Sequence, residues 1–133
     1  KDASAAGATN VDSDGVDMSG YTGVVFYTTF GTILVTAVTG LKGSQSDALA
    51  SGYADLAGSF TSVADDDDNQ LFALEIINPS KRYVRCTVTR ATANAVVGEI
   101  YALRFGAKNL PVTNDVADQV TTKTKTGPLE GTP

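Results

Sequence analysis

The sequence predicts an all-β protein, an antiparallel β-sandwich with extended N- and C-terminal arms. Three observations lead to this prediction. Apolar and polar residues alternate along several short segments, turn-forming residues separate these segments at intervals of about 8–15 residues, and almost no stretch has helical periodicity. Six or so strands at this spacing are typical of a sandwich of jelly-roll or immunoglobulin-like size. A chain of 133 residues has the length of one domain.

The first two strands are predicted at residues 24–30 and 33–38. The first alternates with a period of two, and the second is rich in β-branched residues. Gly31 is expected to separate the two strands, and Gly40 and Gly43 to end the second. The stretch 44–59 has Leu49, Tyr53 and Leu56 at helical spacing, but Gly52 interrupts them. We expect a compact surface loop with about one helical turn there.

Four further strands are predicted in the second half of the chain. The turn residues Asn78 and Pro79 predict a hairpin between the second and third of these strands. Gly98 indicates a bulge or a close backbone approach within the last strand. In the third strand Val84, Cys86 and Val88 are expected to face inward, and Tyr83 and Arg85 outward. The four strands are predicted at residues 60–63, 71–77, 82–90 and 96–105.

Two arms flank the predicted sandwich domain of residues 16–110. Residues 1–15 and 111–133 have few large apolar groups, so neither can bury enough surface to order itself. Residues 120–126 nevertheless alternate as a strand would. Two readings stay open for them: a detached strand that pairs with a neighbour's sheet edge, or a disordered threonine-rich end. The candidate interaction residues are Tyr83, Arg85, Val120, Thr122, Lys123, Thr124 and Lys125.

The composition argues against an enzyme. The chain has no His and a single Cys, which excludes His-based acid–base pairs, a disulfide within the chain and a cysteine metal cluster. Cys86 is expected to be a buried small hydrophobic residue. Glu75 and Glu99 are the acids within predicted strands, where either a solvent-facing position or cross-strand pairing with arginine is expected. The run Asp65–Asp68 lacks the alternating ligands of a calcium loop. We therefore expect no catalytic residue, cofactor or metal.

The net charge of −5 conceals an asymmetry along the chain. Residues 1–70 hold two lysines against ten aspartates, a net charge of −8, whereas residues 71–133 have a net charge of +3. This small basic excess is spaced along a strand and does not form a dense patch, so no nucleic-acid partner is expected. No run approaches the roughly 20 apolar residues of a membrane span. No membrane partner is expected either.

The segments KRYVR (residues 81–85) and GAKNLPV (residues 106–112), together with the acidic turn before them, resemble small virion proteins of tailed bacteriophages. These are the cement or decoration proteins of the head, and the resemblance covers residues 16–113. It implies a jelly-roll-like β-sandwich that forms a homodimer or homotrimer. It also implies that the major capsid protein is a partner, that the protein lies on the capsid exterior of the virion, and that it assembles in the bacterial host cytoplasm.

Two other functions remain open from the sequence. A carbohydrate-binding or adhesion module would use exposed tyrosines as a stacking platform, and Tyr27, Tyr83 and Tyr101 are the candidates. A head–tail joining or tail protein would also combine a small β-domain with extended arms. A glycan screen tests the first alternative, and the number of copies in each particle tests the second.

Overall fold

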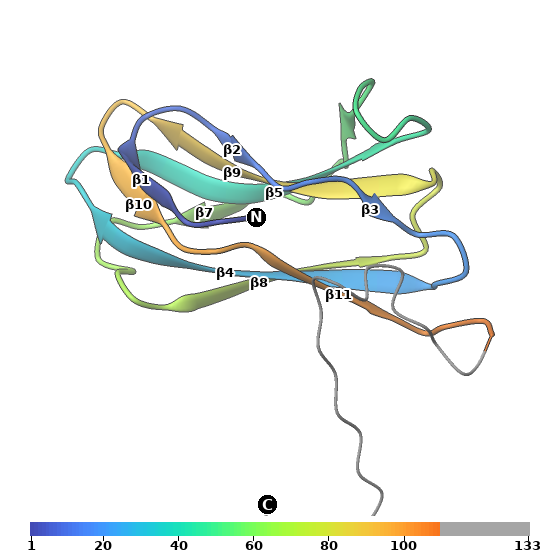
Figure 1. Cartoon of the computed structure of the whole chain (residues 1–133). Helices are drawn as coiled ribbons and strands as arrows, with labels where there is room; N and C mark the ends of the chain where they lie inside the picture. The colour runs from blue at the N-terminus through green and yellow to red at the C-terminus, as the bar shows by residue number, and fades with distance from the viewer. Residues whose placement is uncertain (110–133) are drawn as a thin grey trace, which may run out of the picture.

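Two antiparallel β-sheets lie face to face in residues 1–109, the part of the chain that the computed structural model describes (Figure 1). Sheet I contains β1 (Ser4–Gly7), β4 (Gly23–Ile33), β8 (Leu71–Ile77), β10 (Ala95–Val97) and β11 (Tyr101–Phe105). Sheet II contains β2 (Val11–Asp12), β3 (Val16–Asp17), β5 (Val38–Ser46), β6 (Ala54–Asp55), β7 (Thr61–Val63) and β9 (Tyr83–Ala91). The prediction of an all-β antiparallel sandwich is confirmed.

Each sheet is organised around long central strands. In sheet I, β4 pairs with β8 along one edge and with β10 and β11 along the other, and β1 adds to β10. In sheet II, β5 and β9 pair with each other. The short strands β2 and β3 extend this pair beyond β9, and β6 and β7 extend it beyond β5. The chain crosses between the sheets after β1, β3, β4, β7, β8 and β9, so strands distant in sequence become neighbours.

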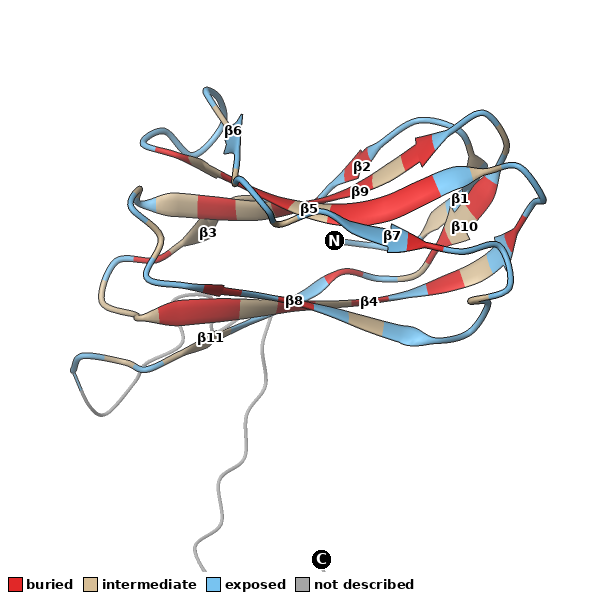
Figure 2. Cartoon of the chain, turned by 180° about the vertical axis from the view of Figure 1, so that it is seen from behind, coloured by how far each residue is buried: buried red, intermediate tan, exposed pale blue. Residues whose placement is uncertain are grey.

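The hydrophobic core fills the space between the sheets. Buried segments concentrate where the central strands of the two sheets face each other (Figure 2). The rings of Phe30 and Phe72 meet edge to face at 5.4 Å, a favourable aromatic geometry. Val84, Cys86 and Val88 are fully buried, which confirms the inward face predicted for this strand.

The predicted break at Gly31 is wrong. β4 runs without interruption to Ile33, because its last residues pair with β10. The turn therefore falls at residues 34–37, and β5 begins at Val38 and continues through Gly40 and Gly43. Gly43 does not end the strand, because it makes room for the core: a Cβ there would lie 2.6 Å from the Cδ1 of Ile76.

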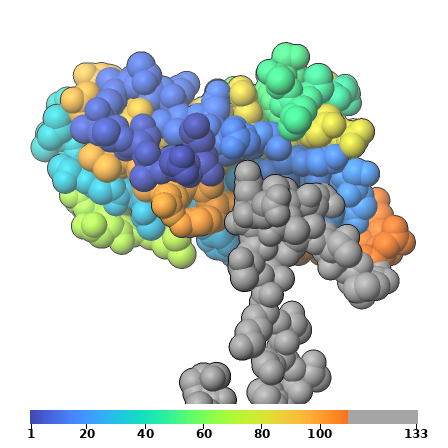
Figure 3. All heavy atoms as spheres, in the orientation of Figure 1, coloured from blue at the N-terminus to red at the C-terminus, as the bar shows by residue number. Residues whose placement is uncertain are grey.

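The expectation of a detached N-terminal arm over residues 1–15 is also wrong. β1 pairs with β10 and β2 pairs with β9, so this segment contributes a strand to each sheet. The first residues lie directly against the β10 region (Figure 3). The segment is held mainly by polar contacts, which hydrophobic patterning cannot reveal. Buried Arg90 donates hydrogen bonds to the carbonyls of Ala5, Thr9 and Ala95 and to the Ser4 hydroxyl.

The remaining expectations are met in part. The strands predicted at 60–63, 71–77 and 82–90 correspond to β7, β8 and β9. The hairpin predicted at Asn78 and Pro79 is wrong, because β8 lies in sheet I and β9 in sheet II, so this turn connects the two sheets. Residues 44–59 contain no helical turn and instead continue β5 and form β6. The strand predicted at 96–105 is interrupted at Gly98, whose N–H donates to the Thr29 carbonyl at 2.7 Å, so the close backbone approach is confirmed. The predicted C-terminal arm lies outside the described residues.

Candidate functional site

The outer surface of sheet II carries charged and polar side chains, and we call it the ionic face. It comprises Asp12, Asp17, Lys42, Asp55, Arg82, Tyr83, Arg85 and Thr87. On and beside it, salt bridges join Lys42 to Asp55 (2.6 Å), Lys81 to Asp47 (3.1 Å), Arg82 to Asp17 (2.7 Å) and Arg85 to Asp12 (3.3 Å). Three of these pairs connect the acidic half of the sequence with its basic half. The fold therefore neutralises part of the charge asymmetry of the sequence, whereas the run Asp65–Asp68 takes part in none of these pairs.

Arg85 lies at the centre of this network. Its Nη1 is 3.3 Å from an Asp12 carboxylate oxygen, and its Nε donates to the Ser44 hydroxyl. Its guanidinium carbon lies 4.3 Å from the centre of the Tyr53 ring, so the segment between β5 and β6 reaches back over the ionic face. The charge of Arg85 and its Nε donor are thus engaged within the chain.

The Asp17–Arg82 pair closes the other end of the ionic face. Arg82 donates from Nε and Nη2 to both carboxylate oxygens of Asp17. These hydrogen bonds, together with one from the Ser19 N–H, hold the pKa of Asp17 below its ordinary value despite partial burial. The Arg82 guanidinium also lies 5.1 Å from the centre of the Tyr83 ring. The partner contacts expected of Tyr83 and Arg85 stay a prediction.

The outer surface of sheet I is almost entirely apolar, and we call it the apolar face. It comprises the outward side chains of β4, β8 and β11: Val25, Tyr27, Thr29, Leu71, Ala73, Glu75, Ile77, Tyr101, Leu103 and Phe105. Four of its large apolar side chains are about three-fifths exposed: Leu71 (66%), Ile77 (59%), Tyr101 (62%) and Leu103 (60%). Contiguous apolar surface of this kind marks a contact site on a protein.

The strand register orders the apolar face into rows. Tyr101 lies opposite Tyr27 and Leu103 opposite Val25, each pair across the β4–β11 ladder. Gly23 extends this surface, because a Cβ at that position would lie 2.2 Å from Cζ of the Phe105 ring that covers it. The only charged residue of the face is Glu75, for which the described residues provide no salt bridge.

A shallow cavity of about 330 Å³ opens at one end of the apolar face. Tyr27 and Tyr101 form part of its wall, and Thr29, Leu71 and Glu99 complete it with Ala3 and Thr28. Two tyrosines beside a carboxylate can stack on and hydrogen-bond a small polar ring. This arrangement unites two of the three tyrosines that the sequence indicated. Tyr83 lies on the opposite sheet.

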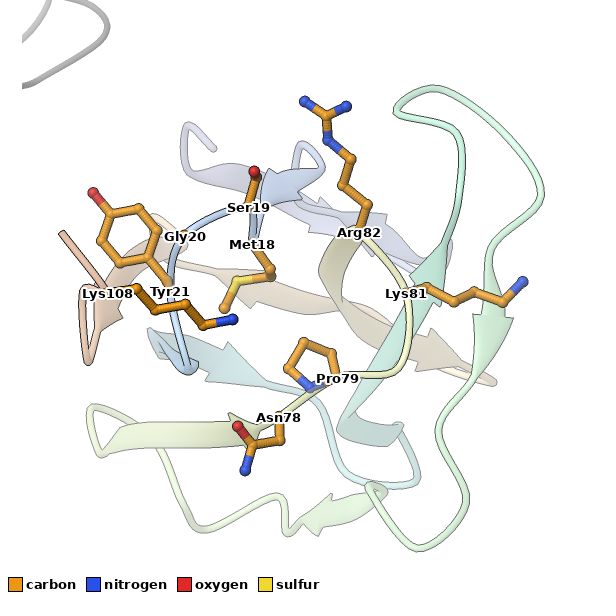
Figure 4. Close-up of a pocket in the computed structure, with 9 residues that line it drawn as sticks. All are labelled: Met18, Ser19, Gly20, Tyr21, Asn78, Pro79, Lys81, Arg82 and Lys108. Atoms are coloured by element: carbon orange, nitrogen blue, oxygen red, sulfur yellow. The ribbon is translucent and has the colours of Figure 1, made fainter.

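A second cavity, of about 470 Å³, lies at the end of the sandwich where Met18 and Pro79 face each other (Figure 4). Its cations do not converge on a common point. Lys108 reaches into the opening, whereas the side chains of Lys81 and Arg82 point away from it (Figure 4) toward their partners Asp47 and Asp17. This cavity therefore lacks the clustered donors of an anion site.

The remaining candidate groups have structural roles. Asp67 accepts hydrogen bonds from the Ala64 N–H and the Gln70 side chain, and Asp68 accepts one from the Ile33 N–H. These contacts use two carboxylates of the acidic run to shape the turn. No cluster of three or more Asp, Glu or Cys side chains suited to a metal ion lies within residues 1–109.

Cys86 is completely buried, and burial raises its thiol pKa to about 12. Such a thiol remains protonated at neutral pH and is a poor nucleophile. The expectation that Cys86 is a buried hydrophobic residue is confirmed.

The strand at 71–77 was predicted correctly, but the apolar face was not predicted. The available signal was the run LFALEII, which is apolar at outward as well as inward positions. An antiparallel strand with one solvated face normally alternates, so a run that is apolar at every position except Glu75 predicts apolar side chains on both faces of the strand. Val120, Thr122, Lys123, Thr124 and Lys125 lie outside the described residues.

A comparison with known proteins found no relative of this chain. No protein-family model, curated protein or solved structure matches the chain. Within the described residues, no helix is long and apolar enough to cross a membrane.

Proposed function

We propose that this protein is a structural virion protein that binds the outside of a tailed-phage head and cements neighbouring major capsid subunits. The observation that carries the proposal is the apolar face, a broad exposed surface on a rigid sheet. The sequence resemblance of residues 16–113 to cement proteins supports the same function. The partner surface on the capsid subunit is apolar, with a cation or hydrogen-bond donor opposite Glu75.

The jelly-roll-like character and the extended C-terminal arm belong to the same proposal. The sandwich acts as a rigid block, and residues 111–133 extend to an adjacent capsid subunit. Fully extended, 23 residues reach about 80 Å. In this arm Val120, Thr122 and Thr124 face one side, and Lys123 and Lys125 the other, in a strand that pairs with a neighbour's sheet edge. Many copies on a closed shell add avidity to a modest affinity.

Binding to isolated heads tests the apolar face. Purified protein is added to heads that lack it, and bound protein is measured after sedimentation. In Leu103→Asp a charge replaces an exposed apolar side chain of the face, and we expect at least tenfold weaker binding. Val38→Asp is the matched control, because Val38 is also about half exposed but lies outside the apolar face. Equal binding by all three proteins would reject the apolar face as the contact.

Removal of residues 114–133 tests the arm separately. The truncated chain retains both sheets, so we expect it to stay folded by circular dichroism. It should coat heads more weakly and no longer protect them from heat. Unchanged coating and protection would exclude the arm from cementing and leave the apolar face as the sole proposed contact.

A carbohydrate-binding module is the second candidate function. The observation in its favour is the cavity in which Tyr27 and Tyr101 lie beside Glu99. A glycan array probed with the native protein and with Tyr101→Ala tests this candidate. A glycan signal that disappears in the variant supports it, and a clean negative across the array rejects it.

A further inference from the structure

β8 is an unprotected edge strand. Within the described chain it pairs only with β4, in an uninterrupted register over seven residues. The other strands at sheet edges have two to five residues. Natural proteins protect such edges with lysine, proline, bulges or very short strands. The segment LFALEII has neither lysine nor proline and carries a single charge, at Glu75.

The backbone groups available along this edge follow from the β4–β8 ladder. The Asn78 N–H donates to the Thr22 carbonyl at 2.7 Å. Thr22 and Asn78, which lie directly beyond the last ladder pair Gly23 and Ile77, therefore form a hydrogen-bonded pair. In an antiparallel ladder hydrogen-bonded and non-hydrogen-bonded pairs alternate. Even-numbered residues of β8 therefore bond to β4. The N–H and C=O groups that point to the open edge belong to Leu71, Ala73, Glu75 and Ile77.

We propose that β8 pairs antiparallel with β8 of a second copy of this chain, about a twofold axis at Leu74. Full overlap of the seven residues places Leu71 opposite Ile77 and Ala73 opposite Glu75. This register brings the four outward-bonding residues of each copy opposite one another, which gives about eight intermolecular backbone hydrogen bonds. In this register the two Glu75 carboxylates do not lie directly opposite each other. Like charges in directly opposite positions would destabilise the strand pair.

The pairing joins the two copies of sheet I into one continuous sheet. The two apolar faces then lie on the same side and form a single larger surface, and the exposed Leu71 and Ile77 side chains become cross-strand partners. A twofold edge contact closes on itself, so it specifies a dimer and not a trimer. The inference extends the self-association within the proposed function, but it rests on β8 and does not require head binding.

The register predicts a charge-dependent change in dimer affinity. Sedimentation equilibrium of the full chain should show a species of twice the chain mass. Ala73→Glu places a carboxylate opposite each Glu75, and the dissociation constant of the dimer should rise about 2- to 30-fold. Ala73→Lys should tighten the dimer by a similar factor. The double variant Ala73→Glu/Glu75→Lys restores opposite charges across the interface and should restore the dimer.

Ala102→Glu is the matched control, because it adds the same charge to an exposed alanine on the opposite edge strand, β11. It should leave dimer affinity unchanged, and circular dichroism verifies that every variant is folded. A monomer at all concentrations overturns the proposal, as does equal weakening by Ala102→Glu or failure of the double variant to recover. Loss of head binding by a variant that still dimerises argues against the proposed function and leaves the dimer intact.

Discussion

The two outer surfaces of the sandwich differ in whether their side chains find partners within the same chain. On the ionic face each acid and base finds a partner from the same chain, and the segment that carries Tyr53 stacks over Arg85. On the apolar face the large side chains of β8 and β11 remain exposed, and no described segment covers them. The conspicuous charges of a sequence can thus be paired within its fold, while an apolar strand without conspicuous charges provides the exposed surface on which the proposed contact rests.

Loss of the Arg85 side chain should have the largest effect on folding stability. Arg85→Ala removes the cation from Asp12, a donor from Ser44 and the group that stacks on Tyr53. We expect the free energy of unfolding to fall by about 1–3 kcal/mol in urea titrations. Arg85→Lys keeps the positive charge but lacks the planar group that stacks on Tyr53. Its free energy of unfolding should therefore lie between those of wild type and Arg85→Ala. An unchanged unfolding midpoint in Arg85→Ala would show that the ionic face is not held by these contacts.

Lowering the pH should have a smaller effect on folding stability, through the Asp17–Arg82 pair. The pKa of Asp17 is lower in the folded chain than its ordinary value of 3.8, mainly because of the hydrogen bonds from Arg82. The ionised carboxylate therefore stabilises the fold above pH 3.8, and this contribution is lost as the pH falls through the folded pKa. Urea unfolding between pH 6 and 2 should show wild type losing its advantage over Asp17→Asn. A constant difference across this range would contradict the pairing.

Substitution on the apolar face should have the smallest effect on stability. Leu103→Thr removes an exposed apolar side chain and keeps a residue with high strand propensity. The free energy of unfolding should change by less than about 0.5 kcal/mol. A loss comparable to that of Arg85→Ala would show that Leu103 supports the fold, and the contrast between the two faces would fail.

The predictable and the unpredictable parts of this fold have different physical origins. The strand 71–77 and the inward face of Val84, Cys86 and Val88 follow from local alternation, which depends only on side-chain direction along a strand. β1 could not be predicted, because its stability comes from pairing with β10 and from the buried Arg90, more than 80 residues away. The continuation of β5 through Gly43 likewise depends on Ile76.

The candidate site also combines features that a single strand predicts with features that depend on distant segments. Tyr83 and Arg85 were identifiable as outward-facing from one strand alone. The engagement of Arg85 with Asp12 and Tyr53 was not, because these partners come from other segments of the chain. The run LFALEII indicated apolar outward side chains on one strand, but the apolar face becomes a surface only when β4, β8 and β11 lie in register.

The sequence by itself determined the all-β class of the described chain, the positions of β4, β7, β8 and β9, and which residues of β9 share a face. These features follow from a period of two, which is local and independent of partners. Only the tertiary structure decided which of the two faces of β4, β8 and β11 meets the core. It also decided which charges are neutralised within the chain and that β8 lies at an open edge. Those properties depend on non-local strand pairing, because each surface is assembled from segments far apart in the sequence.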